Sequence, residues 1–244
     1  MSDWAPKRFW TRTEVTEEPE GYGIALDERK VQTPAKVALI LPSRALAEVV
    51  AAEWDAQTDK VDPRTMPATR GANAAIDKVR HQHGEVAAML ADYGDSDLLC
   101  YRAASPAELV ARQAAAWDPM LDWLDAEFSA RLRPTVGVMH VAQDKAALER
   151  LLSVVQGMSA FELAGFHDLV SISGSLVLGL AATRNVAPIG ELWRLSRVDE
   201  IWQAEQWGAD EDAEATAALK AEAFRDAKRF YDKARPDQDV TAHD

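Results

Sequence analysis

The chain has 244 residues, of which 48% are hydrophobic, so it can bury a core that serves one large domain or two modest ones. It carries 27 basic and 40 acidic side chains, which give a formal net charge of −13. Because this charge repels phosphate backbones and anionic lipid, we expect neither nucleic acid nor a membrane as a partner.

Two features bear on the compartment. Cys100 is the only cysteine in the sequence, so no internal disulfide can form, and this favours a reducing compartment. Its apolar neighbours in DLLCYRA predict a buried thiol rather than a nucleophile. The first ten residues, MSDWAPKRFW, resemble neither a secretory signal nor a transit peptide. We expect the bacterial cytoplasm, or the mitochondrial matrix if a presequence has been removed.

The first elements in chain order are short strands. Within residues 9–41, FWTRTEV alternates between apolar and polar residues, and GYGIALD, KVQTP and KVALILP follow after polar breaks. This pattern predicts a small antiparallel sheet of about four strands. Gly21 and Gly23 form a GxG between strands. We expect a turn or a bulge there, because no helix follows to make it a phosphate-binding loop.

Helical patterns take over at residue 43 and dominate from residue 85 onward. Helices are expected over residues 43–59 and 68–80, and a short strand, TVGVMHVA, is expected before residue 144. A new helix should begin at Pro119, because proline is favoured in the first turn. The side chains expected to cap helix N-termini are Ser43, Ser105, Asp118, Asp144 and Ser159.

The longest uncharged apolar run, residues 169–182, is too short to cross a bilayer and predicts one buried central helix. After residue 207 the chain becomes acidic and rich in alanine, which is typical of an exposed terminal helix, and the residues after 236 should be frayed. The predicted fold class is therefore α+β. A small β-rich domain at residues 1–83 should precede a larger all-helical domain with an acidic tail at residues 84–244.

A search for catalytic and metal-binding motifs gives no site. His81 and His83 would lie on opposite sides of a helix, and no cluster of cysteine and histidine has zinc spacing. His167 beside Asp168 is typical of a histidine at the edge of a core. The serines in residues 171–175 predict close helix packing with hydroxyls bonded to carbonyls. We expect no catalytic residue, no metal and no cofactor.

The stretch SRVDEIWQAEQWGA at residues 196–209 is unusual. Its apolar helical stripe is interrupted by Glu205, while Asp199 and Glu200 form a second acidic spot within reach of Gln203. Trp207 and the glycine after it close the segment. The eight tryptophans of the chain favour protein binding, since tryptophan dominates binding hot spots as well as cores.

Several longer segments together resemble one known family. They include KRFW at residues 7–10, GYGIALDERKVQTP at 21–34, AAEWDAQ at 51–57, MPAT at 66–69, DLLCYRA at 97–103, QAAAWDPMLDW at 113–123, GSLVLGLA at 174–181 and SRVDEIWQAEQWG at 196–208. In this order and spacing they resemble the Atp12 type of ATP synthase assembly chaperone. The resemblance implies a two-domain protein without enzymatic activity that binds the unassembled alpha subunit of the catalytic head until the beta subunit replaces it.

The resemblance also implies a partner-binding site. The family pattern DE..Q...WG maps onto Asp199, Glu200, Gln203 and Trp207, with Glu200 the first choice for the functional acid and Asp199 the alternative. Trp54 and the adjoining Asp55 are a second choice. Trp54 shares a helix face with apolar residues and could instead anchor its helix on the sheet. We expect a monomer.

Two other functions remain open at this point. An acidic helical adaptor for another client would not bind isolated alpha subunit. An enzyme using Glu200 or Glu205 as an acid or base, with a histidine such as His167, would place these groups around a closed pocket.

Overall fold

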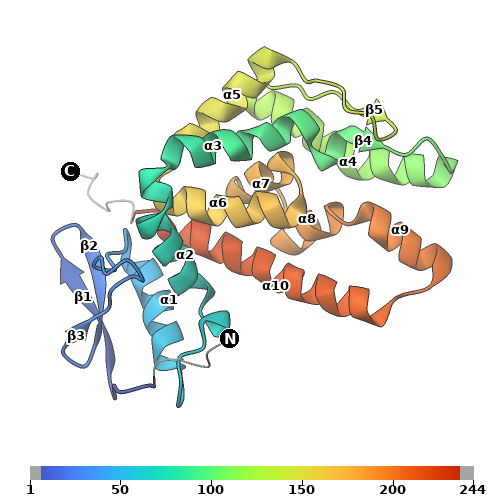
Figure 1. Cartoon of the computed structure of the whole chain (residues 1–244). Helices are drawn as coiled ribbons and strands as arrows, with labels where there is room; N and C mark the ends of the chain where they lie inside the picture. The colour runs from blue at the N-terminus through green and yellow to red at the C-terminus, as the bar shows by residue number, and fades with distance from the viewer. Residues whose placement is uncertain (1–6, 237–244) are drawn as a thin grey trace, which may run out of the picture. The chain divides into compact units, whose positions relative to one another are not determined.

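The computed structural model describes residues 7–236, and their contacts group the chain into two compact units (Figure 1). The first unit contains the residues up to Gln82, the segment Ser159–Gly165 and the residues from Arg229 onward. The second contains His83–Met158 and Phe166–Lys228. The domain boundary expected after residue 83 remains a prediction. No helix among residues 7–236 combines the length and the apolar character that crossing a membrane requires.

The sheet of the first unit is antiparallel, as predicted, with strand order β1 (Thr13–Glu18), β2 (Gly21–Leu26) and β3 (Arg29–Lys30). The expected fourth strand does not form, because residues 31–41 join the sheet only through isolated bridges such as the one between Tyr22 and Leu41. The two glycines of the GxG lie inside β2 rather than in a turn. Gly21 has φ +144°, and a Cβ atom there would lie 2.2 Å from the Leu41 carbonyl oxygen.

Two helices complete the first half of this unit. Helix α1 (Arg44–Asp55) begins where predicted, since the Leu46 amide donates to the Ser43 hydroxyl at 3.0 Å, and it packs on β1 and β2. Helix α2 (Pro67–Asp77) packs against α1 and is followed by a 3₁₀ turn (Val79–His81). The helix predicted over residues 68–80 is therefore confirmed except for its last turn.

The later chain returns to this unit. Phe230, near the end of α10 (Glu211–Ala234), is buried against Gly71 of α2 and Gly165 of α6 (Ala160–Ser173). A Cβ atom at either glycine would come within 3.0 Å of the Phe230 ring. The close approach of these helices therefore requires glycine at both positions.

The second unit is helical apart from the short parallel pair β4 (Tyr101–Arg102) and β5 (Thr135–Val136). Together with the small sheet of the first unit, these helices confirm the α+β class. Helix α4 packs against α7 and α9, α3 packs against α5, and α7 packs against α8 (Figure 1). The bounds of the helices not yet given are α3 His83–Ala91, α4 Ala107–Phe128, α5 Lys145–Gln156, α7 Leu176–Thr183, α8 Ile189–Leu195 and α9 Val198–Trp207.

The predicted helix start at Pro119 is wrong, because α4 runs through this residue without a break. Trp117, Leu121 and Leu124 are all buried, so the packed face of the helix continues across the proline. The Asp118 carboxylate does not cap a helix. It accepts a hydrogen bond from Arg102 Nη2 at 2.7 Å. Tertiary packing outweighs the local preference for a helix start here.

The single helix predicted over residues 169–182 is also wrong. Helix α6 ends at Ser173, Gly174 has φ +70°, and α7 begins with the Ser175 hydroxyl accepting from the Leu178 amide at 3.0 Å. The Ser173 hydroxyl donates to the Leu169 carbonyl at 2.7 Å, as predicted for a serine in a packed helix. The break divides the apolar run between the end of α6 and α7, and every residue of α7 is buried.

The remaining caps differ in outcome. Asp144 and Ser159 accept hydrogen bonds from the helix amides that follow them, as predicted. Ser105 caps nothing, because Pro106 takes the N-cap position of α4 without a side-chain hydrogen bond.

The strand expected in TVGVMHVA is reduced to the two residues of β5. The terminal helix is exposed over its acidic first half, as predicted, but its second half is buried at Phe224 and Phe230. The prediction that residues after 236 are frayed falls outside the described chain.

Candidate functional site

Helix α9 carries four of the six predicted site residues and is held firmly at its start. Val198, its first residue, is buried, and just before the helix the Leu195 carbonyl accepts a hydrogen bond from Trp117 Nε1 at 2.8 Å. The Trp117 indole itself is buried in α4. These contacts fix which side of α9 faces α4, and therefore where the two acidic side chains of its first turn, Asp199 and Glu200, lie.

The Asp199 side chain is positioned by a buried glutamine. Gln113, on α4, is only 1% exposed. Its Oε1 accepts from the Ala103 amide at 2.8 Å, and its Nε2 donates to Asp199 Oδ1 at 2.7 Å. Because the partner is a neutral amide, Asp199 keeps its full negative charge available. Among residues 7–236 no lysine, arginine or histidine forms an ion pair with this carboxylate.

Asp199 lines a pocket of about 640 Å³ that is open to the surface, here called the Asp199 pocket. Its charged groups are Asp199 and Arg102, and the arginine is already paired with Asp118. The other walls are mainly apolar or carry neutral polar groups. They come from Tyr101, Ala103, Ala104, Ser105, Pro106, Leu109, Gln113, Gly137, Val138, Trp202, Gln203, Gln206 and Trp207.

Glu200 points to a different pocket, of about 540 Å³, here called the Glu200 pocket. The residues of α9 that line it include Ile201 and Ala204, and Ala213 and Ala217 of α10 lie opposite. Gln203 and Trp207 line both pockets. The two acids of the DE pair are therefore not interchangeable, because each belongs to its own pocket on one side of α9.

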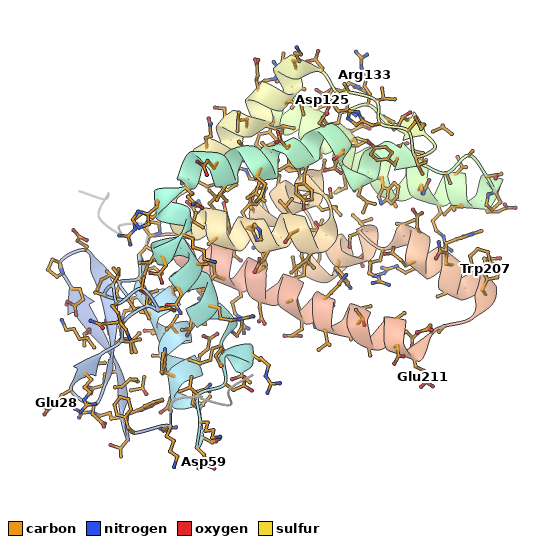
Figure 2. The ribbon with its side chains drawn as sticks, viewed as in Figure 1. Glu28, Asp59, Asp125, Arg133, Trp207 and Glu211 are labelled. Atoms are coloured by element: carbon orange, nitrogen blue, oxygen red, sulfur yellow. The ribbon has the colours of Figure 1, made fainter. Side chains whose placement is uncertain are left out.

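Trp207 stands at the last turn of α9, just before the connection to Glu211 (Figure 2). Its side chain is 80% exposed, which is unusual for an indole in a chain that buries Trp10 and Trp117. An exposed indole between two pockets is the kind of side chain that anchors a protein partner.

The Glu205 side chain lies on the surface and forms an ion pair with Arg112. Arg112 Nη2 lies 2.8 Å from Glu205 Oε2, and the same guanidinium lies 5.1 Å from the centre of the Trp202 ring. The acid that interrupts the apolar stripe thus belongs to an exposed ion pair that places an arginine over an indole. It faces neither pocket.

Trp54 and Asp55 belong to the first unit, at the end of α1. The Trp54 ring meets Trp10 edge to face, with centroids 5.4 Å apart, and is half-buried. Asp55 is exposed and lies 3.4 Å from Arg8 Nη2. The structure therefore places the second-choice residues in a different unit from the α9 residues. Their role in binding a partner remains a prediction.

Neither His167 nor Cys100 is placed to act as a catalytic group at the two pockets. His167 Nδ1 lies 2.9 Å from Asp168 Oδ1, and the hydrogen bond that this carboxylate accepts from the ring raises the pKa of the histidine. No histidine is among the described residues that line either pocket. Burial raises the pKa of the Cys100 thiol to about 12, which leaves it uncharged and unreactive. Across residues 7–236, no three histidine, cysteine, aspartate or glutamate side chains gather to hold a metal ion.

Two features of the site were not predicted. Gln113 gives no sequence signal, because a glutamine in a helix is ordinarily exposed. The apolar loop, defined here as residues 136–141, was interpreted as part of a strand. Its alternation of valine and methionine with small and polar residues fits a strand, but the chain bends at residues 137–139 after β5, and its apolar side chains are exposed.

Comparison with known proteins identifies the family to which the chain is similar. The model of the ATP12 chaperone protein family matches residues 7–125. The crystal structure of Atp12 from Paracoccus denitrificans is similar, with 48% identity and a TM-score of 0.91, covering 94% of this chain and 98% of that one. An aspartate-to-lysine mutant of that protein matches at 47% identity with the same coverage and TM-score.

A third solved structure, the Atu1473 protein from Agrobacterium tumefaciens, is 39% identical, with a TM-score of 0.90. The match covers 94% of this chain and 87% of that one. Similarity of this degree over nearly the whole length, together with the family match, shows that the chain belongs to the ATP12 chaperone family.

Proposed function

We propose that this chaperone assists assembly of the ATP synthase by binding the unassembled alpha subunit of its catalytic head. It would cover the surface that aggregates before the beta subunit takes its place, and it would do so without catalysing a reaction. The bacterial cytoplasm or the mitochondrial matrix is the proposed compartment. An unassembled oligomer subunit exposes an apolar interface, and a temporary partner removes this interface from water.

The observation that carries the proposal is the exposed face of α9. It presents an indole at Trp207, two carboxylates at Asp199 and Glu200, and pockets on both sides. Aromatic side chains beside polar groups are typical of protein-binding surfaces, and open pockets without a histidine argue against acid–base catalysis. We propose Glu200 as the acid that contacts arginine, lysine or backbone amides of the client, with Asp199, Gln203 and Trp207 beside it.

The test is co-expression of the chain with its cognate alpha subunit in the absence of beta. Wild type should keep alpha soluble and co-purify with it, whereas Glu200→Lys should not. The matched control is Glu149→Lys, which makes the same charge change at an exposed position of α5 in the same unit. Circular dichroism should show that both variants fold.

The outcomes separate the alternatives. If wild type does not bind alpha but captures another protein, the chain is an adaptor with a different client. If both variants retain alpha equally, binding to alpha stands and Glu200 is not its site. Loss of binding in the Glu149→Lys control would mean that overall charge, rather than the α9 face, governs the interaction.

A further inference from the structure

The apolar loop (residues 136–141) is a surface feature that the fold does not explain. Four large apolar side chains lie exposed within these six residues, at Val136, Val138, Met139 and Val141. Val138 is 89% exposed and Met139 is 77% exposed. Single exposed apolar residues are ordinary, but a cluster of four on one loop indicates a contact surface.

The loop is anchored at both ends, so its apolar tip is held in place. At its start β5 pairs with β4, and the Gly137 amide donates to the Arg102 carbonyl at 2.8 Å. At its end His140 Nε2 lies 2.9 Å from Asp95 Oδ2, and the Gln143 amide donates to Asp95 Oδ1 at 2.7 Å. These anchors present the tip instead of burying it.

The start of the loop forms one wall of the Asp199 pocket. Gly137 and Val138 line this pocket together with Trp202 and Trp207 of α9. The pocket therefore has apolar walls from two elements that are far apart in the sequence, and both walls end in side chains that are exposed to solvent.

The polar end of the pocket is Asp199. Gln113 fixes the position of this carboxylate without neutralising it, while Arg102 is already paired with Asp118. The charge that the pocket offers to an incoming group is therefore negative. A cation brought there would form a charge-assisted hydrogen bond with a preorganised acceptor, which is stronger than one between neutral groups.

We propose that the Asp199 pocket recognises an apolar side chain next to an arginine or lysine in the client, with Val138 and Trp207 gripping the apolar group and Asp199 the cation. This inference rests on the proposed function and specifies the chemistry of recognition. The proposal gives Asp199 and Glu200 different roles, because Asp199 would bind the cation of this client segment while Glu200 lines the other pocket. It also adds the apolar loop to the binding surface.

The experiment measures affinity for isolated alpha subunit at low and high salt. Asp199→Asn removes the charge but keeps an oxygen for Gln113, and we expect about tenfold weaker binding with a smaller salt dependence. Replacing Val138 and Met139 together by serine should also weaken binding about tenfold, because apolar contact area is lost. The control is Leu219→Ser on α10, which removes an equally exposed apolar side chain that lines neither pocket.

A second measurement identifies the segment of the alpha subunit that the chain binds. Overlapping peptides that span the alpha subunit are probed with wild-type protein, and the bound peptides should share an apolar residue beside arginine or lysine. Replacing either the apolar residue or the arginine or lysine of a bound peptide by alanine should abolish its binding to wild-type protein. The Asp199→Asn variant should bind the peptide with the cation and the peptide without it equally weakly.

The failures are distinguishable. If wild type binds alpha and the Asp199→Asn and double-serine variants bind within about twofold of it, the inference is overturned and the proposed function stands. Bound peptides without a cation would overturn the inference in the same way. If wild type does not bind alpha at all, both the proposed function and this inference are overturned.

Discussion

Gln113 and Asp199 are 86 residues apart in the sequence and joined by a hydrogen bond of 2.7 Å between amide Nε2 and carboxylate Oδ1. The other end of the same amide accepts from the Ala103 backbone. One buried side chain thus ties together α4, the segment that follows β4, and the start of α9. These are three of the elements that line the Asp199 pocket.

Replacing Gln113 by leucine should therefore affect both stability and binding. The half-buried Ala103 amide loses its acceptor, which should lower the free energy of unfolding by about 1 kcal/mol. Asp199 is freed to move, so affinity for alpha should fall as well. Urea denaturation and a binding titration check the two effects. Unchanged affinity in a folded Gln113→Leu protein would show that Asp199 needs no positioning.

The buried indole of Trp117 gives a second prediction. Trp117→Phe keeps most of the ring but removes the donor to the Leu195 carbonyl, so it should destabilise the second unit by about 1–3 kcal/mol. Trp117→Ala also leaves a cavity and should cost about 3–5 kcal/mol. Chemical denaturation measures both. Equal losses in the two variants would mean that the hydrogen bond, rather than packing, carries the effect.

Asp97 gives the protein a pH dependence of known sign. Burial raises the pKa of this carboxyl from 3.8 to about 6, although it accepts hydrogen bonds from Ser175 and the Leu99 and Val177 amides. The folded state therefore holds a proton that the unfolded state releases between about pH 4 and pH 6. Stability should fall as pH rises through this window, by on the order of 3 kcal/mol, and remain level above it.

The control for this effect is Asp97→Asn, which does not titrate. Hydrogen bonds lower the pKa of Glu18, Asp27 and Asp62, so stability that depends on these groups rises with pH in both proteins. The difference between wild type and variant isolates Asp97. Parallel stability curves for the two proteins from pH 4 to pH 7 would contradict the assignment.

Substitutions can distinguish the roles of Trp54 and Asp55 in folding and in binding. Trp54→Ala removes the edge contact with Trp10 and should destabilise the first unit by about 3 kcal/mol, whereas Trp54→Phe should cost less. Asp55→Asn loses only an exposed ion pair with Arg8 and should leave stability unchanged. If Asp55→Asn weakens binding to alpha at unchanged stability, this end of α1 contacts the client. Defects confined to Trp54→Ala would indicate a folding role alone.

Local signals predicted much of the fold. Ser43, Asp144 and Ser159 each have a side chain that can accept from an amide two or three residues later, and all three begin helices as predicted. These predictions succeed because the cap and the amides it satisfies lie within one turn. The same holds for the antiparallel pairing of β1 with β2, which requires only a short connection.

The errors arise where distant contacts decide. Asp118 before Pro119 has the sequence of a helix start, but Arg102 engages the carboxylate and the buried face of α4 continues past the proline. The break at Gly174 could have been predicted from the serine that follows it, since Ser175 caps α7. For the site, the residue types on α9 were readable. Their division between two pockets was not, because Gln113 and the apolar loop come from other parts of the chain.

The burial of Phe230 has a consequence for biosynthesis. The ring packs against Gly71 and Gly165, so the hydrophobic core of the first unit is built from residues that leave the ribosome at widely separated times. The sheet with α1 and α2 is translated early, whereas Phe230, which packs against Gly71 of α2, is translated near the end of the chain. A member of a chaperone family therefore depends, during its own synthesis, on its final helix to complete the core of its first unit.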